Sequence, residues 1–294
     1  ERKKERKKES DMWIWHFFQM LLRCPWHDGG GKDTVSSHPS NQCNCPMCKN
    51  GYHLRKKIGE GGFGAVYTSS KDDLAIKITS SCELNDSIME YKVLMQVAGH
   101  THILQPIDFY VHHGAPVLVT ELIHGGDLAS RIGNGAEFST DELATIAEQM
   151  LSALAHIHGK GYIHRDVKSD NILCVSRSFF KLADFGLCCA SSRKDKTMQV
   201  GTTFLMAPEV QRGNGCYGRK VDSFSLGATL VELGIATFLT SKFSSSRDEM
   251  LLLLKQQRPE IGMAFQNLVR DLTAFSERRR SDAATALQTF DALF

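Results

Sequence analysis

The stretch "YIHRDVKSDNILC", residues 162–174, places a histidine, an arginine, a lysine, two aspartates and an asparagine between apolar residues. Apolar residues on both sides are typical of a strand or a buried turn. Charged groups in such surroundings are costly unless they are paired or bound to a ligand. Asp166 precedes Asn171 by five residues, with Lys168 between them. The pattern therefore predicts a site of polar chemistry.

The composition of the whole chain is that of an ordinary globular protein. Its 294 residues are 42% hydrophobic and 23% charged, enough for one large domain or two lobes. A net charge of +2 gives no strong case for nucleic acid as the main partner of the chain. No apolar run approaches the roughly 20 residues of a transmembrane segment. Nine cysteines, an odd number, favour a reducing, intracellular compartment, the cytoplasm or the nucleus.

A glycine-rich motif, "IGEGGFGAV", carries Gly59, Gly61 and Gly64 before Val66. Glycine lets backbone N–H groups approach a phosphate because it has no Cβ to clash. Dinucleotide-binding folds use the same spacing before a helix, whereas "AVYTSS" (65–70) is typical of a strand. Taken alone, the motif also fits a glycine-rich hairpin without a ligand.

Lys77 ends the alternating apolar stretch "LAIK". A lysine in this position is either an edge residue whose charge reaches water or a phosphate ligand. A phosphate-binding lysine needs a carboxylate to hold it, and Glu90 lies on the next predicted helix. Glu90 by itself is equally typical of a solvated helix.

The predicted elements change character along the chain. Residues 54–122 predict five strands and one helix, which covers residues 84–99 and stops at Gly99. Beyond Gly126 the pattern is helical. Residues 138–161 begin with a capping box, Ser139 with Glu142, and continue with an apolar stripe. Residues 221–236 predict a helix that is apolar on all sides and therefore buried.

Two further motifs follow the opening stretch, "KLADFG" at 181–186 and "APE" at 207–209. In this order the motifs resemble those of the eukaryotic-type protein kinase family, serine/threonine class. The resemblance covers residues 52–294. It implies an α+β, bilobal protein kinase fold.

The resemblance also implies where the lobes lie. A small N-lobe with an antiparallel sheet and one main helix would span residues 52–122. A larger helical C-lobe would span residues 123–294. Residues 1–51 would form an N-terminal extension with a basic run, an amphipathic helix and a short zinc-knuckle-like element.

The catalytic roles are those that the resemblance implies for phosphoryl transfer from ATP. Asp166 would act as the catalytic base toward the substrate hydroxyl, and Lys168 would lie beside the transferred phosphoryl group. Thr202 would bond both residues. Asn171 and Asp184 would hold Mg²⁺.

The nucleotide site is implied in the same way. Lys77, paired with Glu90, would contact the α- and β-phosphates of ATP. Thr120 would be the gatekeeper behind the adenine, and the backbone of Glu121 and Ile123 would bond the ring. The full set is Gly59, Gly61, Gly64, Val66, Ala75, Lys77, Glu90, Thr120, Glu121, Ile123, Asp127 and Leu173.

Supporting contacts are implied as well. His164 and Phe185 would belong to a packed column, Asp222 would brace the catalytic loop, and Arg280 would pair with Glu209. Lys168 with Thr202 favours serine/threonine specificity. Asp127 and Asp170 lie where some family members recognise basic residues of the substrate.

Cysteine and histidine in the N-terminal extension form a second pattern. "CPWH" (24–27) and "CNCPMC" (43–48) have the spacing of zinc ligands, and a Cys₃His site would suit one Zn²⁺. So short a segment has almost no core, so metal would be needed to fold it. A tail with free thiols is the alternative. The predicted ligands are Cys24, His27, Cys45 and Cys48.

The leading hypothesis is a serine/threonine kinase whose partners are ATP and a protein substrate. A nucleotide-binding, pseudokinase-like scaffold is one alternative. A binding module formed by the zinc segment, with the kinase as effector, is another. By the same resemblance, Arg165 before Asp166 implies activation by phosphate on the loop after "DFG", added by an upstream kinase or by self-phosphorylation in trans. Thr197 is the best candidate among Ser191, Ser192, Thr197 and Thr203, and a loop held by its own contacts is the alternative. Nucleic acid is not an expected partner of the kinase domain.

Overall fold

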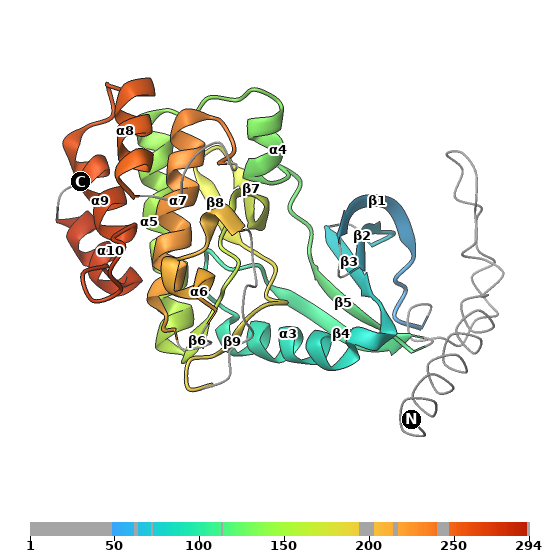
Figure 1. Cartoon of the computed structure of the whole chain (residues 1–294). Coiled ribbons are helices and arrows are strands. Elements are labelled where there is room, and N and C mark those ends of the chain that lie inside the picture. Colours follow the sequence, from blue (N-terminus) through green and yellow to red (C-terminus); the bar gives the residue numbers. More distant parts are fainter. Residues whose placement is uncertain are drawn as a thin grey trace, which may run out of the picture. The chain divides into compact units, whose positions relative to one another are not determined.

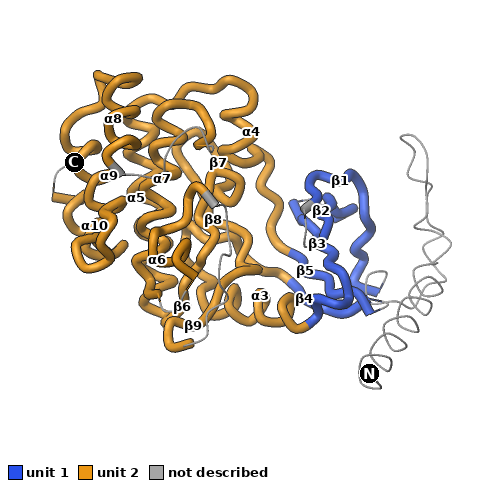
Figure 2. The backbone as a smooth tube through the Cα atoms, viewed as in Figure 1, with its two compact units in different colours: residues 1–84, 108–119 blue, residues 85–107, 120–294 orange. Residues whose placement is uncertain are grey.

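The computed structural model of the chain divides into two compact units (Figure 2). Unit 1 comprises residues 1–84 and 108–119, and unit 2 comprises residues 85–107 and 120–294. The structure describes residues 49–61, 64–71, 73–112, 114–193, 203–213, 217–239 and 247–292. The predicted zinc ligands, Thr197 and Thr202 lie outside these residues. The lobe boundary predicted between residues 122 and 123 remains a prediction.

Unit 1 is built on a five-stranded sheet with the order β1-β2-β3-β5-β4 (Figure 1). The strands are β1 (Leu54–Gly61), β2 (Gly64–Ser69), β3 (Leu74–Thr79), β4 (Pro106–His112) and β5 (Ala115–Glu121). The ends of β4 and β5 nearest residues 107 and 120 belong to unit 2. Tyr52, Ile76, Val117 and Val119 form the buried core on one face. The predicted strands are confirmed.

The turn between β1 and β2 requires glycine at its end. Gly64 has φ of 145°, and a Cβ there would lie 2.2 Å from the backbone oxygen of Ile78. Any side chain would therefore clash with β3 as well as strain the backbone. The sequence-based expectation of a strand, a glycine turn and a second strand is correct here.

Two long helices, α5 (Thr140–Gly159) and α7 (Lys220–Ile235), form the centre of unit 2. They pack against each other, and α10 (Ala283–Asp291) packs on both (Figure 1). The predicted stripe of α5 is buried in full, and so is almost the whole of α7. The prediction of a helix that is apolar on all sides is therefore confirmed, since α7 is enclosed by α5, α8 and α9.

The capping box predicted for α5 is only half formed. Ser139 Oγ accepts the backbone N–H of Glu142 at 3.1 Å, as predicted. The Glu142 carboxylate does not return to the backbone of Ser139, because it binds the Arg131 guanidinium at 2.6 Å instead. A charged partner at hand forms a stronger hydrogen bond than a neutral backbone donor.

Shorter elements complete the fold. Helix α3 (Leu84–Val97) ends as predicted before Gly99, whose φ is 86°. No helix of the described ranges is long and apolar enough to span a membrane. The remaining elements are η1 (Ser81–Glu83), α4 (Leu128–Gly133), β6 (Tyr162–Ile163), η2 (Ser169–Asn171), β7 (Ile172–Ser176), β8 (Phe179–Leu182), β9 (Cys189–Ala190), η3 (Thr203–Leu205), α6 (Pro208–Gln211), α8 (Arg247–Gln257), α9 (Met263–Leu272) and α10 (Ala283–Asp291).

Candidate active site

One buried carboxylate, that of Asp222, holds the backbone of the loop between β6 and η2. Asp222, in the first turn of α7, has no exposed surface. Its Oδ2 accepts the backbone N–H of His164 at 2.8 Å, and its Oδ1 accepts that of Arg165 at 2.7 Å. His158 Nε2 donates to Oδ2 at 2.7 Å. The brace predicted for Asp222 is confirmed.

The charge of Asp222 is maintained by these donors. Burial alone would raise the pKa of its carboxyl group, because a charged group loses hydration there. The hydrogen bond from His158 and the neighbouring positive groups outweigh burial, so the pKa is lowered. The carboxylate is therefore ionised at neutral pH and holds two consecutive backbone amides in place.

Two hydrogen bonds and one ring contact hold the His164 imidazole in one orientation. Its Nδ1 accepts the backbone N–H of Asp166 at 3.3 Å, and its Nε2 lies 3.1 Å from the backbone oxygen of Ala183. The first contact makes Nδ1 an acceptor, so the proton of the neutral ring is on Nε2 and is donated to Ala183. The ring packs edge-on against Phe185, with 5.0 Å between centroids. The predicted contact of His164 with Phe185 is confirmed.

Two non-glycine residues of the site have left-handed backbone conformations. Arg165 has φ of 71° and Asp184 has φ of 58°. Such conformations are uncommon for side chains of this size and persist only where surrounding contacts enforce them. The amide held by Asp222 supplies that constraint at Arg165. Its guanidinium donates to the backbone oxygen of Leu187 at 2.5 Å and to the hydroxyl of Tyr217 at 3.2 Å.

The Asp166 carboxylate of this loop is buried and is held by two side-chain donors. It is 7% exposed, and its Oδ2 accepts from Lys168 Nζ at 2.9 Å and from Asn171 Nδ2 at 3.0 Å. The same amide of Asn171 donates to the backbone oxygen of Asp166 at 2.8 Å. Lys168 is half-buried, which alone would lower its pKa, but the bond to Asp166 and the charges of Asp166, Asp170 and Asp184 raise it. The ammonium group is therefore charged at neutral pH.

The residues predicted to hold Mg²⁺ come together through the backbone. The Ala183 N–H donates to the Asn171 backbone oxygen at 2.8 Å. This bond brings the backbone of Asp184, the next residue after Ala183, near Asn171. The side-chain nitrogen of Asn171 faces Asp166. The Oδ1 atom of Asn171 is therefore the one that could serve as a metal ligand. A carboxylate with an amide oxygen is a donor set that Mg²⁺ accepts. Among the described residues, no cluster of three or more His, Cys, Asp or Glu side chains suits a metal ion.

A buried ion pair stabilises the segment after η3. Arg280 is 1% exposed, and its guanidinium donates to both oxygens of Glu209, at 2.5 and 3.0 Å. Its Nε donates to the backbone oxygen of Ala274 at 2.9 Å. The guanidinium carbon lies 5.1 Å from the centre of the Phe224 ring. The predicted pairing of Arg280 with Glu209 is confirmed.

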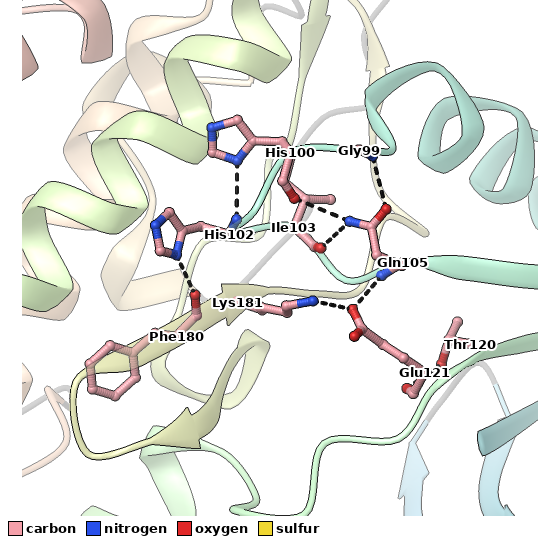
Figure 3. Close-up of polar contacts among 9 residues, drawn as sticks. All are labelled: Gly99, His100, His102, Ile103, Gln105, Thr120, Glu121, Phe180 and Lys181. Atoms are coloured by element: carbon pink, nitrogen blue, oxygen red, sulfur yellow. Dashed lines mark hydrogen bonds and ion pairs between the residues drawn. The ribbon is translucent and has the colours of Figure 1, made fainter. Parts of the chain in front are cut away.

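The end of β5 carries the predicted gatekeeper and hinge. Thr120 is 7% exposed and donates its hydroxyl to the backbone oxygen of Glu121 at 3.1 Å. Figure 3 shows that the Glu121 carboxylate accepts from Lys181 Nζ at 2.5 Å and from the backbone N–H of Gln105 at 2.8 Å. The sequence did not point to these two contacts, because Gln105 belongs to no motif and Lys181, although it opens "KLADFG", was given no role there.

Asp127, directly before α4, and Leu173, on β7, lie next to each other. They form an antiparallel bridge, and Gly125 permits it, because a Cβ there would lie 2.2 Å from the backbone oxygen of Cys174. Asp127 caps α4 by accepting the Ser130 N–H at 2.6 Å. Its second oxygen is therefore available to a ligand. Ile123 lies in the connection between β5 and α4.

A further acidic group lies near the catalytic loop. Glu232, on α7, is 3% exposed and accepts the Leu239 N–H at 2.8 Å. Burial, together with the charge of Asp170, raises its pKa to about 7. Sequence reasoning missed Glu232 because an acidic residue in an apolar helix carries no motif.

The remaining predicted residues lie in unit 1, on α3 or outside the described residues. The β1–β2 hairpin carries the glycines and Val66, while β3 carries Ala75 and Lys77. Glu90 lies on α3 in unit 2, where its carboxylate is close to Gly186. The pairing of Lys77 with Glu90 stays a prediction, as do the roles of Thr202 and of the four zinc ligands.

Comparison with known proteins adds independent findings. A family model described as "Protein kinase domain" matches residues 52–290. "Serine/threonine-protein kinase MST20" of Pyricularia oryzae is 35% identical over 191 residues, covering 62% of this chain and 21% of that protein. "Serine/threonine-protein kinase pakA" of Talaromyces marneffei is 36% identical over 191 residues, covering 62% and 29%. "Serine/threonine-protein kinase STE20" of Yarrowia lipolytica is 36% identical over 190 residues, covering 62% and 17%.

The chain thus spans less than a third of the length of these curated relatives. The aligned part of this chain is less than two thirds of its own length, whereas the family model reaches from residue 52 to residue 290.

Proposed function

Because the chain belongs to the protein kinase family, we propose that it transfers the γ-phosphoryl group of ATP to a serine or threonine hydroxyl of a protein. The observation that carries this proposal is the Asp166 carboxylate, held by Lys168 and Asn171 on a loop that Asp222 braces. The names of the curated relatives support serine/threonine specificity.

Asp166 acts as the base toward the hydroxyl in this proposal. One of its oxygens is occupied by the two donors, so the second is the one offered to the hydroxyl proton. Lys168 lies beside Asp166 with its charge intact, so it stabilises negative charge on the phosphoryl group as the bond to it forms. Asn171 and Asp184 would hold Mg²⁺, which supplies charge neutralisation to the phosphates when bound.

The nucleotide would be held by groups from several elements. We propose that Lys77 and the backbone of the β1–β2 hairpin contact the phosphates, with Glu90 as the partner of Lys77. Thr120, Glu121 and Ile123 would bond or border the adenine, together with Val66, Ala75 and Leu173. The second oxygen of Asp127 would reach the ribose.

The acidic groups near the catalytic loop suggest which substrates are preferred. Asp170 is exposed, and Glu232 lies close enough for its pKa to respond to the Asp170 charge. A substrate cation placed near them would relieve the repulsion between the two carboxylates. We therefore propose that peptides with an arginine near the acceptor residue are phosphorylated better than peptides without one.

The test uses Asp166→Asn, which keeps the size of the side chain and removes the base. Turnover with ATP and Mg²⁺ is expected to fall about a hundredfold or more, the usual contribution of a general base. Asp271→Asn, at an exposed pair with Arg270, is the matched control and keeps its turnover. Wild-type rates in Asp166→Asn would remove Asp166 from the mechanism. ATP binding without any turnover in the unchanged chain would favour the scaffold alternative.

The N-terminal segment carries a separate proposal, that Cys24, His27, Cys45 and Cys48 bind one Zn²⁺. Its support is the ligand spacing in the sequence alone. An intracellular location is proposed from the odd number of cysteines in the sequence. The cysteines of the described ranges, Cys82, Cys174, Cys188 and Cys189, form no disulfide.

A further inference from the structure

The loop between α3 and β4 folds around one glutamine side chain, Gln105. Its Oε1 accepts the Gly99 N–H at 2.8 Å. Its Nε2 donates to the backbone oxygens of His100 at 3.1 Å and Ile103 at 2.5 Å (Figure 3). Three contacts to three different residues fix the whole course of the loop, since each would otherwise leave a backbone group unpaired.

The backbone of Gln105 connects this loop to the hinge. Its N–H donates to Glu121 Oε1 at 2.8 Å, and its carbonyl oxygen accepts the Glu121 N–H at 3.1 Å. Glu121 is therefore held twice by one residue, once through its carboxylate and once through its backbone. Lys181, on β8, binds the same carboxylate oxygen at 2.5 Å.

The same loop pairs with the strand that leads into the metal-binding segment. The Leu104 N–H donates to the backbone oxygen of Leu182 at 3.0 Å, and the Leu182 N–H donates to that of His102 at 2.9 Å. His102 Nδ1 lies 2.9 Å from the backbone oxygen of Phe180. Leu182 precedes Asp184 by two residues. The loop thus contacts both the hinge and the start of the "DFG" segment.

We propose that Gln105 is a positioning residue for the nucleotide: it holds the loop that sets the backbone of Glu121 in the geometry required for adenine binding. The inference rests on the proposed function, because it assigns the Glu121 backbone to adenine. Gln105 itself touches neither adenine nor phosphate in this proposal. It acts through Glu121, and the Lys181 contact keeps the carboxylate directed toward Gln105.

A purely structural role is the competing explanation. Half-buried glutamines that bond backbone groups also stabilise loops without any effect on a ligand. Gln149 is such a residue in the same unit. Its side chain accepts the Phe180 N–H and donates to the Ser178 backbone oxygen, both at 2.8 Å. It therefore supports the β7–β8 hairpin but makes no contact with the hinge.

This pair of glutamines defines the experiment, in which Gln105→Leu is compared with Gln149→Leu in the full chain. Both variants lose side-chain bonds to backbone groups, so both are expected to lower the melting temperature. Only Gln105→Leu is expected to raise KM for ATP and the dissociation constant of adenosine, each by about fivefold or more. KM for the peptide should stay unchanged in both variants.

A double-mutant cycle with Glu121→Ala tests whether Gln105 influences adenosine binding through Glu121. Without the carboxylate, Gln105→Leu should weaken adenosine binding by less than it does in the unchanged chain. Equal KM and adenosine affinity in Gln105→Leu, Gln149→Leu and the unchanged chain would overturn the inference. So would a full effect of Gln105→Leu in the Glu121→Ala background. Failure of the unchanged chain to bind ATP would instead overturn the proposed function.

Discussion

Replacing Arg280 by leucine should destabilise unit 2 severely. The substitution leaves the Glu209 carboxylate, 7% exposed, without the two guanidinium donors that now satisfy both of its oxygens. It also leaves the backbone oxygens of Ala274 and Lys220 without their bonds, at 2.9 and 3.0 Å. The ring of Phe224 loses the cation above it.

The magnitude follows from the burial of the pair. Removing one partner of a buried ion pair costs about 3–5 kcal/mol, because the other charge stays buried and unpaired. A change of 1 kcal/mol shifts the melting temperature of a domain of this size by about 2–4 °C. The melting temperature of Arg280→Leu should therefore fall by roughly 10 °C, measured by circular dichroism.

Two controls separate the buried charge from arginine loss in general. Arg270→Leu removes an exposed arginine from its pair with Asp271, at 3.4 Å, and should cost about 1 kcal/mol or less. Arg280→Leu combined with Glu209→Leu should recover part of the loss, since no charge remains buried. If Arg280→Leu melts at the same temperature as Arg270→Leu, the pair does not stabilise the fold as argued.

Four further outcomes are expected. Thr120→Met should weaken inhibitors that reach behind the adenine by about tenfold, measured as inhibition constants; equal affinity would mean that another group closes the space. Burial, with the nearby rings of His156 and His102, lowers the pKa of His100 to about 4, so the stability of the fold should fall as pH drops from 6.5 toward 4. The variant His100→Asn should lose part of this dependence in urea titrations, and an unchanged profile would contradict the assignment. Elemental analysis should find one zinc ion per chain, and its absence from protein prepared without chelator would refute the site proposed at Cys24, His27, Cys45 and Cys48. Mass spectrometry of active protein should find phosphate on Thr197, and full activity of Thr197→Ala would show that this phosphate is not needed.

The contacts within the polar motifs were predicted well because the spacing of these residues along the chain largely determines their geometry. Asp166, Lys168 and Asn171 lie within one turn of chain, so their contacts depend mainly on local backbone conformation. The pairing of Glu209 with Arg280 joins residues far apart in sequence. It was predicted only through the resemblance, since "APE" marks Glu209 but nothing in the local sequence indicates that Arg280 is its partner.

Contacts that depend on tertiary packing were missed. His158 and Asp222 meet because α5 and α7 pack together, and nothing around His158 indicates a buried partner. The capping box at Ser139 is only half formed for a related reason, because Arg131, on a different helix, binds the Glu142 carboxylate. A local rule describes only the partners that are near in sequence, whereas a charged side chain binds the best donor in space.

The contacts of Asp222 and Arg165 support the prediction that phosphate on the loop after Leu187 regulates activity. The Asp222 carboxylate accepts two backbone amides and the ring of His158, so it leaves the Arg165 guanidinium to other partners. Those partners, the Leu187 backbone oxygen and the Tyr217 hydroxyl, are both neutral. The acceptors in these two bonds carry no charge to balance the half-buried guanidinium, which therefore attracts an anion. The bond from Arg165 to Leu187 links the loop that begins there to the residue before Asp166. A phosphate added to that loop would therefore act close to Asp166, the proposed catalytic base.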